Sequence, residues 1–74
     1  MRITVKLFAT FRSGRFAVEI RDYPAGTAVS DIVAELALAD QKLGMLLVNS
    51  RPVGLDRILA DGETLALFPL VDGG

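Results

Sequence analysis

The stretch GTAVSDIVAEL, residues 26–36, contains the one long helical pattern of the chain. Its apolar residues recur at i, i+3, i+4 and i+7, on one face of a helix: Val29, Ile32, Val33 and Leu36. Thr27 stands where a residue that caps a helix is expected, and Asp31 near the start suits the helix dipole. We therefore predict a helix over about residues 28–38, with one apolar face to bury.

Alternating apolar and polar residues on both sides of this segment indicate strands with one buried face. The alternation covers residues 2–8 and 16–21, and the connector containing Gly14 favours an antiparallel hairpin between them. After the predicted helix, residues 45–49 form an apolar run, and residues 64–68 alternate again. We predict a strand at each of these four places.

Shorter elements are expected between the later strands. Pro52 limits residues 51–53 to a brief strand at an edge, and residues 55–59 are expected to form one helical turn. Tight turns are predicted at residues 23–26 and 60–63, where proline, glycine and aspartate gather.

One helix can cover only one face of one sheet, so these elements favour a two-layer fold. We predict an α+β fold of the β-grasp, or ubiquitin-like, type, in which a mixed sheet packs on one main helix. The first two strands and the last are expected side by side. The expected core consists of inward-facing apolar residues: Val5, Leu7, Val18, Ile20, Ile32, Leu36, Val48, Leu65 and Leu67.

The composition excludes several classes of function. A chain of 74 residues that is 51% hydrophobic and 23% charged is expected to fold as one small domain. It contains no cysteine and no histidine, so we predict no disulfide, no metal site of the usual Cys/His kind, and no thiol or imidazole catalyst. The net charge of −1 is spread along the chain, and no apolar run approaches the roughly 20 residues of a membrane span. We expect a cytoplasmic protein that binds neither nucleic acid nor membranes.

The chain ends on FPLVDGG, residues 68–74, where an apolar strand leads directly into two glycines. Glycine adds no side chain to a core and costs the most entropy to order, so a fold gains little from this ending. We predict a β-grasp domain over residues 1–69 and a flexible tail over residues 70–74. Six residues beyond Phe68 extend at most about 20 Å, which is enough to enter the active-site channel of another protein. A frayed end without a function is the alternative.

Five pieces of the sequence resemble the MoaD/ThiS family of ubiquitin-like sulfur carriers, over essentially the full length. They are KLFATFR, GTAVSDIVAEL, LLVNSRPV, ILADGETLALFP and the final Gly73-Gly74. The resemblance implies a carrier of the molybdopterin synthase small subunit type, without catalytic side chains of its own. The reactive group would be the carboxylate of Gly74, with Gly73 providing the approach to it. Because the chain has no cysteine to hold a persulfide, its end is also the available place for sulfur.

The resemblance also implies partners. An E1-like adenylyltransferase of the MoeB/ThiF type would adenylate Gly74 with ATP, and sulfur would then replace AMP to give a thiocarboxylate. The carrier itself would bind no cofactor, because the ATP is used by the activating enzyme. A larger synthase subunit of the MoaE type, or a thiazole synthase, would receive the sulfur.

A docking surface for such partners can be predicted from the strand pattern. Phe8 and Phe68 fall on strand faces opposite the helix-packed core, and exposed apolar patches often mark interfaces. Family members use apolar residues at these positions and near Pro52, and Pro69 leads from the last strand into the tail. The alternative is that the two phenylalanines are incidental surface residues.

The tail departs from the family pattern at Leu70, where a second proline is usual, and at Asp72, where a small residue is usual. Our first hypothesis is sulfur transfer in molybdopterin-type cofactor synthesis, with Val71 and the other tail residues entering the partner. Carriers for thiamin thiazole, cysteine or tungsten-cofactor pathways are the nearest alternatives. A ubiquitin-like protein modifier and a plain interaction module remain further alternatives.

Overall fold

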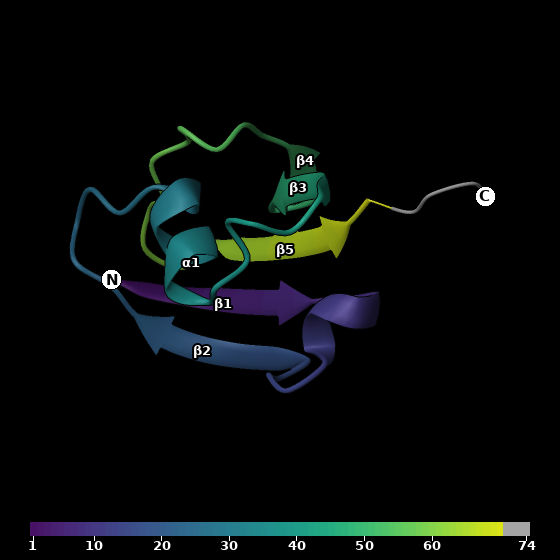
Figure 1. The fold of residues 1–74 in the computed structure, drawn as a ribbon. Coiled ribbons are helices and arrows are strands. Elements are labelled where there is room, and N and C mark those ends of the chain that lie inside the picture. Colours follow the sequence, from purple (N-terminus) through teal and green to yellow (C-terminus); the bar gives the residue numbers. More distant parts are fainter. Residues whose placement is uncertain (71–74) are drawn as a thin grey trace.

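The computed structural model describes residues 1–70, which form a five-stranded sheet with one α-helix packed across one face (Figure 1). The elements in chain order are β1 (Arg2–Leu7), the 3₁₀ helix η1 (Ala9–Arg12), β2 (Val18–Asp22), α1 (Val29–Glu35), β3 (Leu43–Val48), β4 (Arg51–Pro52) and β5 (Thr64–Pro69). The predicted α+β architecture, a mixed sheet on one main helix, is confirmed.

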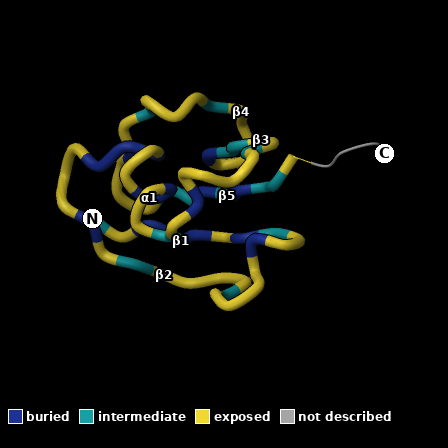
Figure 2. Tube along the Cα trace, in the orientation of Figure 1, coloured by how far each residue is buried: buried dark blue, intermediate teal, exposed yellow. Residues whose placement is uncertain are grey.

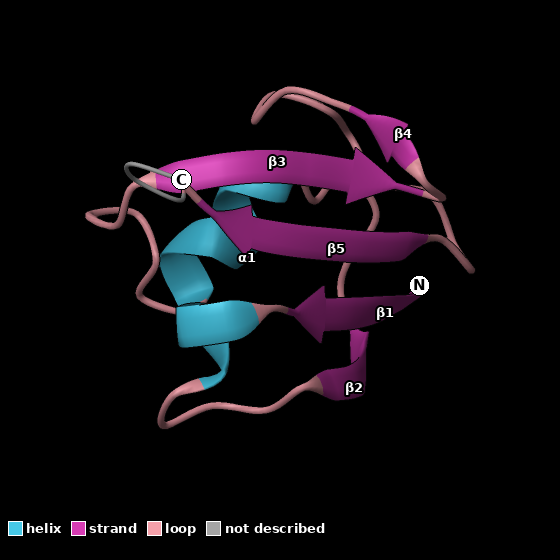
Figure 3. Ribbon diagram, turned by 90° about the vertical axis from the view of Figure 1, so that its right-hand side faces the viewer, coloured by secondary structure: helices cyan, strands magenta, loops and turns pink. Residues whose placement is uncertain are grey.

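The strands lie in the order β2-β1-β5-β3-β4 (Figure 3). The central pair, β1 and β5, is parallel, and every other neighbouring pair is antiparallel. The first two strands and the last are therefore adjacent, as predicted. A parallel pair requires a long crossover connection, and the crossover here includes α1, which covers one face of the sheet.

The core lies between α1 and the sheet (Figure 2). Six of the predicted core residues are buried: Val5, Leu7, Ile32, Val48, Leu65 and Leu67. Ile3 and Val29 are fully buried as well, and both continue the apolar periodicity of their own elements. Burial of this continuous apolar surface is the main source of stability in so small a domain.

The prediction that Val18 and Ile20 belong to the core is wrong. Their side chains are 58% and 66% exposed. In the antiparallel pair, Val18 lies opposite Lys6 and Ile20 lies opposite Thr4, and directly paired residues point to the same face of a sheet. Because Val5 faces α1, its neighbours on β1 face away from the helix, and so do Val18 and Ile20.

Helix α1 ends earlier than predicted, at Glu35, because Ala37 adopts a left-handed conformation with φ of 58°. The Leu38 amide donates to the Val33 carbonyl at 2.9 Å, and the Ala37 amide donates to the Ala34 carbonyl at 3.0 Å. This pair of bonds is the Schellman motif that terminates many helices. It buries Leu38 fully and leaves Leu36, a predicted core residue, only half-buried. Within residues 1–70 no helix is long and apolar enough to span a bilayer.

We expect Ala37→Gly to stabilise the protein by about 0.5–1 kcal/mol, because glycine adopts the left-handed conformation without a Cβ penalty. Urea unfolding of the variant and the wild type measures the difference. Ala34→Gly is the matched control, since Ala34 lies inside α1, where glycine costs a similar amount. Equal destabilisation by the two substitutions would contradict this account of the helix end.

The start of α1 also differs from the prediction, because Thr27 does not cap the helix. The N-cap residue is Ala28, whose amide donates to the Asp31 carboxylate at 2.9 Å. The Thr27 hydroxyl instead donates to the Pro24 carbonyl at 2.8 Å, and the Thr27 amide donates to the same oxygen. The turn therefore covers residues 24–27, one position later than predicted.

One connection is not as predicted. Residues 55–59 contain a turn and then an isolated bridge between Ile58 and Ala28, and no helical turn. The predicted antiparallel pairing of β1 and β2 is confirmed, and the connection between them contains η1, whose Phe11 is buried in the core. The Arg15 guanidinium holds this connection against the end of α1, with Nε donating to the Leu36 carbonyl at 2.9 Å.

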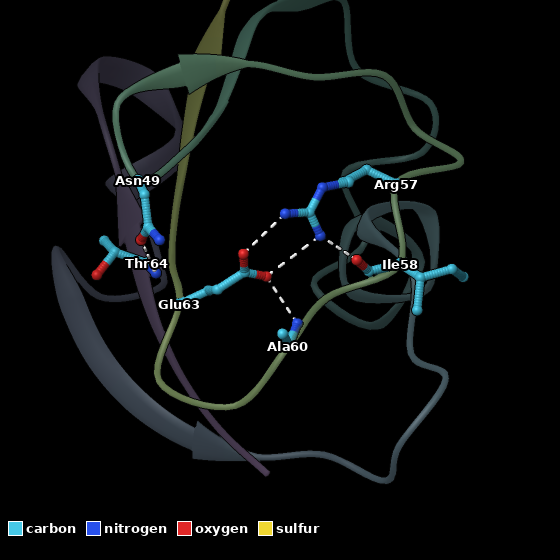
Figure 4. Close-up of polar contacts among 6 residues, drawn as sticks. All are labelled: Asn49, Arg57, Ile58, Ala60, Glu63 and Thr64. Atoms are coloured by element: carbon cyan, nitrogen blue, oxygen red, sulfur yellow. Dashed lines mark hydrogen bonds and ion pairs between the residues drawn. The ribbon is translucent and has the colours of Figure 1, made fainter.

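A set of turn residues fixes the end of the sheet at which β5 begins (Figure 4). Asn49 has a φ of 49°, and its side-chain oxygen accepts a hydrogen bond from the Thr64 amide at 2.9 Å. The Glu63 carboxylate pairs with Arg57 at 2.7 Å and accepts a hydrogen bond from the Ala60 amide at 2.6 Å. Arg57 also donates to the Ile58 carbonyl. These contacts hold the loop before β5 in one conformation.

We expect Glu63→Gln to lower the free energy of unfolding at pH 7 by about 1–2 kcal/mol. The hydrogen bonds from Arg57 and from the Ala60 amide lower the pKa of Glu63 below its ordinary value of 4.5. A lowered pKa contributes stability that is present above the unfolded-state pKa and lost as the pH falls through the folded-state value. The variant should therefore lose less stability than the wild type when urea unfolding is repeated below pH 4.5. Asp40→Asn, at an exposed carboxylate, is the control, and identical acid profiles for wild type and Glu63→Gln would contradict the prediction.

Candidate functional site: the outer face and the base of the tail

The sheet face opposite α1 is open, and Figure 3 views the sheet from this side, with α1 behind it. We call it the outer face. The register places on it one residue in two from each strand: Arg2, Thr4, Lys6, Val18, Ile20, Asp22, Leu47, Pro52, Thr64 and Ala66. Alternation produces this set directly, because the intervening residues of β1 and β5 are buried against α1. The outer face is therefore a mixture of apolar, small polar and charged side chains.

Two aromatic rings stack at the end of the outer face where β1 and β5 both end. The ring centroids of Phe8 and Phe68 are 4.1 Å apart, with an interplanar angle of 7°. The Phe8 amide donates to the Leu67 carbonyl at 3.2 Å, which fixes the backbone of Phe8 beside β5. The Arg12 guanidinium lies 5.6 Å from the Phe8 ring centroid, within range of a cation–π interaction. Both phenylalanines face away from the core, as the strand pattern predicted.

A hollow of about 420 Å³ lies beside this stack. Its lining combines residues of the outer face with the turn that follows β3: Lys6, Phe8, Leu47, Asn49, Ser50, Thr64, Ala66 and Phe68. Lys6 is the one charged residue among them. The walls of the hollow combine apolar and aromatic side chains with the hydroxyl and amide groups of Asn49, Ser50 and Thr64.

The other two predicted partner-binding residues lie at different places. Pro52 is exposed on the edge strand β4, directly opposite Leu47, so it extends the outer face at its border. Pro69 is the last residue of β5 and pairs with Leu43. The structure therefore brings Phe8 and Phe68 into contact, and places Pro52 and Pro69 at the margins of the same sheet. Binding by these residues stays a prediction.

The tail begins from a closely fitted backbone contact. The Leu70 amide donates to the Lys42 carbonyl at 3.0 Å. Gly44 packs so tightly against Pro69 that a Cβ at this position would lie 2.5 Å from the Pro69 carbonyl oxygen. The register between β3 and β5 shifts between Leu43 and Leu46, as at a β-bulge, and this shift includes Gly44. The chain thus leaves the sheet at Leu70 with its backbone direction set by β3. The predicted tail residues Val71, Asp72, Gly73 and Gly74 lie outside the described residues.

Among residues 1–70 no group of three or more acidic, histidine or cysteine side chains is placed to hold a metal. Burial, and then the hydrogen bond to Glu35, raise the pKa of Tyr23 to about 12. This hydrogen bond joins the residue that follows β2 to α1, on the helix side of the sheet. The sequence interpretation missed Lys6 and Gly44 as residues of the candidate site, although the position of Lys6 between two buried residues of β1 was a usable signal.

The fold is shared with known proteins. A protein from Pyrococcus furiosus described as molybdopterin converting factor, subunit 1, is 29% identical, with 96% of this chain and 99% of that chain covered and a TM-score of 0.78. The small archaeal modifier protein 1 of Haloferax volcanii is 27% identical, with 95% and 98% covered and a TM-score of 0.75. A chain in the complex of subunits 1 and 2 of molybdopterin-converting factor from Helicobacter pylori is 20% identical, with full coverage of both chains and a TM-score of 0.68, and shows the fold alone.

Comparison with curated proteins gave no match. The family model described as the ThiS family matches residues 5–74, which is nearly the whole chain and includes all the strands but the first residues of β1. The structural neighbours share its β-grasp sheet on one helix, and two of them exceed a quarter identity over almost all of this chain. The chain therefore belongs to the ThiS family, within the ubiquitin-like sulfur carriers and modifiers.

Proposed function

We propose that this protein is a sulfur carrier whose Gly74 carboxylate is adenylated and then converted to a thiocarboxylate. The observation that carries the proposal is the position of the Phe8–Phe68 stack at the end of β5 from which the tail departs. A partner that covers the stack also stands where residues 70–74 begin. Docking and delivery of the tail are thus combined at one end of the sheet.

The Gly74 carboxylate needs activation before its oxygen can be exchanged for sulfur. A free carboxylate is a poor acyl donor, because it has no good leaving group. Attack of a Gly74 oxygen on the α-phosphate of ATP releases pyrophosphate and forms an acyl adenylate. The outer sulfur of a persulfide on the sulfur donor then attacks the acyl carbon, and AMP leaves. A thiol cleaves the resulting acyl disulfide, which releases the thiocarboxylate and leaves a disulfide on the donor side. The ATP site belongs to the activating enzyme, an E1-like adenylyltransferase. The part played by this chain is to dock, and to bring its end to that site.

The outer face must supply the energy for docking, because ordering the tail costs about 1–2 kcal/mol per residue. An aromatic pair is a strong anchor, since aromatic side chains bury large apolar areas and dominate many interfaces. Phe8 and Phe68 are each half-buried in the free protein, so part of each ring remains to be covered. The apolar wall of the hollow adds Leu47 and Ala66 to the same surface.

For the pathway, we propose molybdopterin-type cofactor synthesis with a larger synthase subunit as acceptor. The likeness to the Pyrococcus furiosus protein supports it, because that protein is described as a converting factor subunit. The second candidate function is protein modification, in which Gly74 forms isopeptide bonds with lysines of targets. The comparable likeness to the small archaeal modifier protein favours this candidate to a similar degree.

Mass spectrometry of the intact protein separates these functions. The chain is expressed with its E1-like enzyme and a sulfur donor of the cysteine desulfurase or rhodanese type. The carrier function predicts that its mass rises by the difference between one sulfur and one oxygen atom, and that the chain expressed alone shows no rise. Adducts on other proteins, lost when Gly74 is deleted, would favour the modifier. An unchanged mass with every E1-like enzyme of the genome would disprove the carrier proposal.

A further inference from the structure

Lys6 occupies the middle of the outer face. It lies on β1, between the neighbouring strands β2 and β5, and its register partners on either side are Val18 and Ala66. The Val18 side chain is exposed, and the Phe8–Phe68 stack lines the same hollow as Lys6. The lysine is thus a single positive charge surrounded by apolar and small side chains.

Among residues 1–70 Lys6 forms no ion pair, and Asp22, the carboxylate that the register places on the outer face, lies further along β2 and pairs with Arg2. No carboxylate lines the hollow. The nearby acidic residues are paired with other groups: Asp22 with Arg2, Glu19 with Arg21, and Glu63 with Arg57. Arg12, over the Phe8 ring, adds a second cation at the rim. Lys6 and Arg12 thus place positive charge beside the Phe8–Phe68 stack, although the whole chain has a net charge of −1.

This charge matters only when the outer face is covered. An exposed ammonium is well solvated by water, but a partner that buries the hollow removes that water. A buried charge is strongly unfavourable unless the partner provides an opposite charge and hydrogen bonds. Serine, threonine and asparagine in the lining are neutral and cannot neutralise it. The compensating group has to come from the partner.

We propose that the activating enzyme presents an acidic side chain to Lys6, set within an apolar surface that covers the Phe8–Phe68 stack. The inference rests on the proposed function, in which an E1-like adenylyltransferase docks on the outer face. Activation is the step that every sulfur-carrier pathway and the modifier alternative have in common, so this partner is required by each. Lys6 then selects among adenylyltransferases by charge, while the aromatic stack supplies the contact area.

The test measures ATP–pyrophosphate exchange by the E1-like enzyme of the same genome, with this protein as the varied substrate. We expect Lys6→Glu to raise KM at least about tenfold with little change in kcat, because like charges would meet in the interface. Lys6→Arg, which keeps the charge, should stay close to the wild type. Arg51→Glu is the matched control, since it makes the same change in net charge at an exposed residue that does not line the hollow. Its KM should change less than about threefold. Thermal unfolding confirms that all three variants fold.

The decisive arm is a charge exchange. Replacing one acidic residue of the enzyme by lysine should restore the low KM of Lys6→Glu and impair the wild type. Equal effects of Lys6→Glu and Arg51→Glu would overturn the inference, as would normal exchange by Lys6→Glu. A lower KM for Lys6→Glu would overturn it too, by indicating that Lys6 holds the acidic tail of its own chain. If the wild-type chain supports no exchange with any E1-like enzyme, the proposed function itself fails.

Discussion

Deletion of Gly74 is expected to reduce adenylation of the chain to the background rate while the fold stays intact. The shortened chain still ends in a glycine carboxylate, at Gly73, so the chemical group is conserved. The position of the carboxylate changes, because one residue spans about 3.3–3.6 Å of extended chain. A displacement of about 1 Å can cost about a hundredfold in rate at an active site, so a shift of a full residue should be close to complete loss.

Pyrophosphate exchange and the mass of the intact chain measure this effect. An added residue after Gly74 should act in the same way as the deletion, since it also moves the carboxylate. The control carries the same extension before Met1, at the opposite end of β1 from the Phe8–Phe68 stack, and should be activated normally. Equal unfolding free energies for these variants would show that the loss lies in the tail. Wild-type adenylation of the shortened chain would show that Gly74 does not carry the reacting group.

The alternation of residues predicted the strands well but did not decide which face of β2 is buried. Val18 and Ile20 have the hydrophobicity of core residues, yet they lie on the outer face. Periodicity specifies that two faces differ, whereas the register with β1 specifies which face meets the helix. On the helix side, β2 carries Arg21, which forms an ion pair with Glu35 of α1 at 3.2 Å. An edge strand tolerates apolar residues on its outer face, because α1 does not fully cover its inner face.

The end of the helix was harder to predict, because its signal lies in tertiary packing. A terminating glycine is the usual sequence sign of a Schellman motif, and the chain has Ala37 at that position. The burial of Leu38 offsets the strained backbone of Ala37. Phe11 was missed for a related reason, since its burial depends on a 3₁₀ helix within a connection that had no periodicity.

The sequence motifs that indicated the family divide into two groups by place. The asparagine of LLVNSRPV and the LADGE part of ILADGETLALFP lie in the turns before β5. There the side chains of Asn49 and Glu63 accept hydrogen bonds from backbone amides. The FP motif lies at the other end of β5, at the aromatic stack and the tail. Turn residues could be recognised from their types, and Phe68 from its strand face. The closeness of Gly44 to Pro69 could not be recognised from the sequence, because it depends on the bulge that sets the distance between β3 and β5.

That contact leads to the second large effect, for Gly44→Ala. The φ angle of Gly44 lies outside the left-handed region, so alanine fits the backbone conformation. The added Cβ, however, would lie 2.5 Å from the Pro69 oxygen and 2.8 Å from the Pro69 carbonyl carbon. These are backbone atoms, so the end of β5 has to move away from β3. We expect a loss of about 1–3 kcal/mol in stability, and a fall of about a hundredfold in the kcat of adenylation.

Hydrogen exchange at the Leu70 amide, together with adenylation kinetics, tests this prediction. The Leu70 amide donates to the Lys42 carbonyl in the wild type, and the variant should exchange it faster as β5 moves away. Gly54→Ala is the matched control, because its Cβ would meet only the movable Asp56 side chain, at 3.0 Å. The control should keep both the protection and the rate. A Gly44→Ala protein with normal kcat and a protected Leu70 amide would show that the direction of the tail is not set by β3. The expected loss of kcat with a normal KM would show that the docking surface is intact. The defect would then lie in the position at which the tail leaves the sheet.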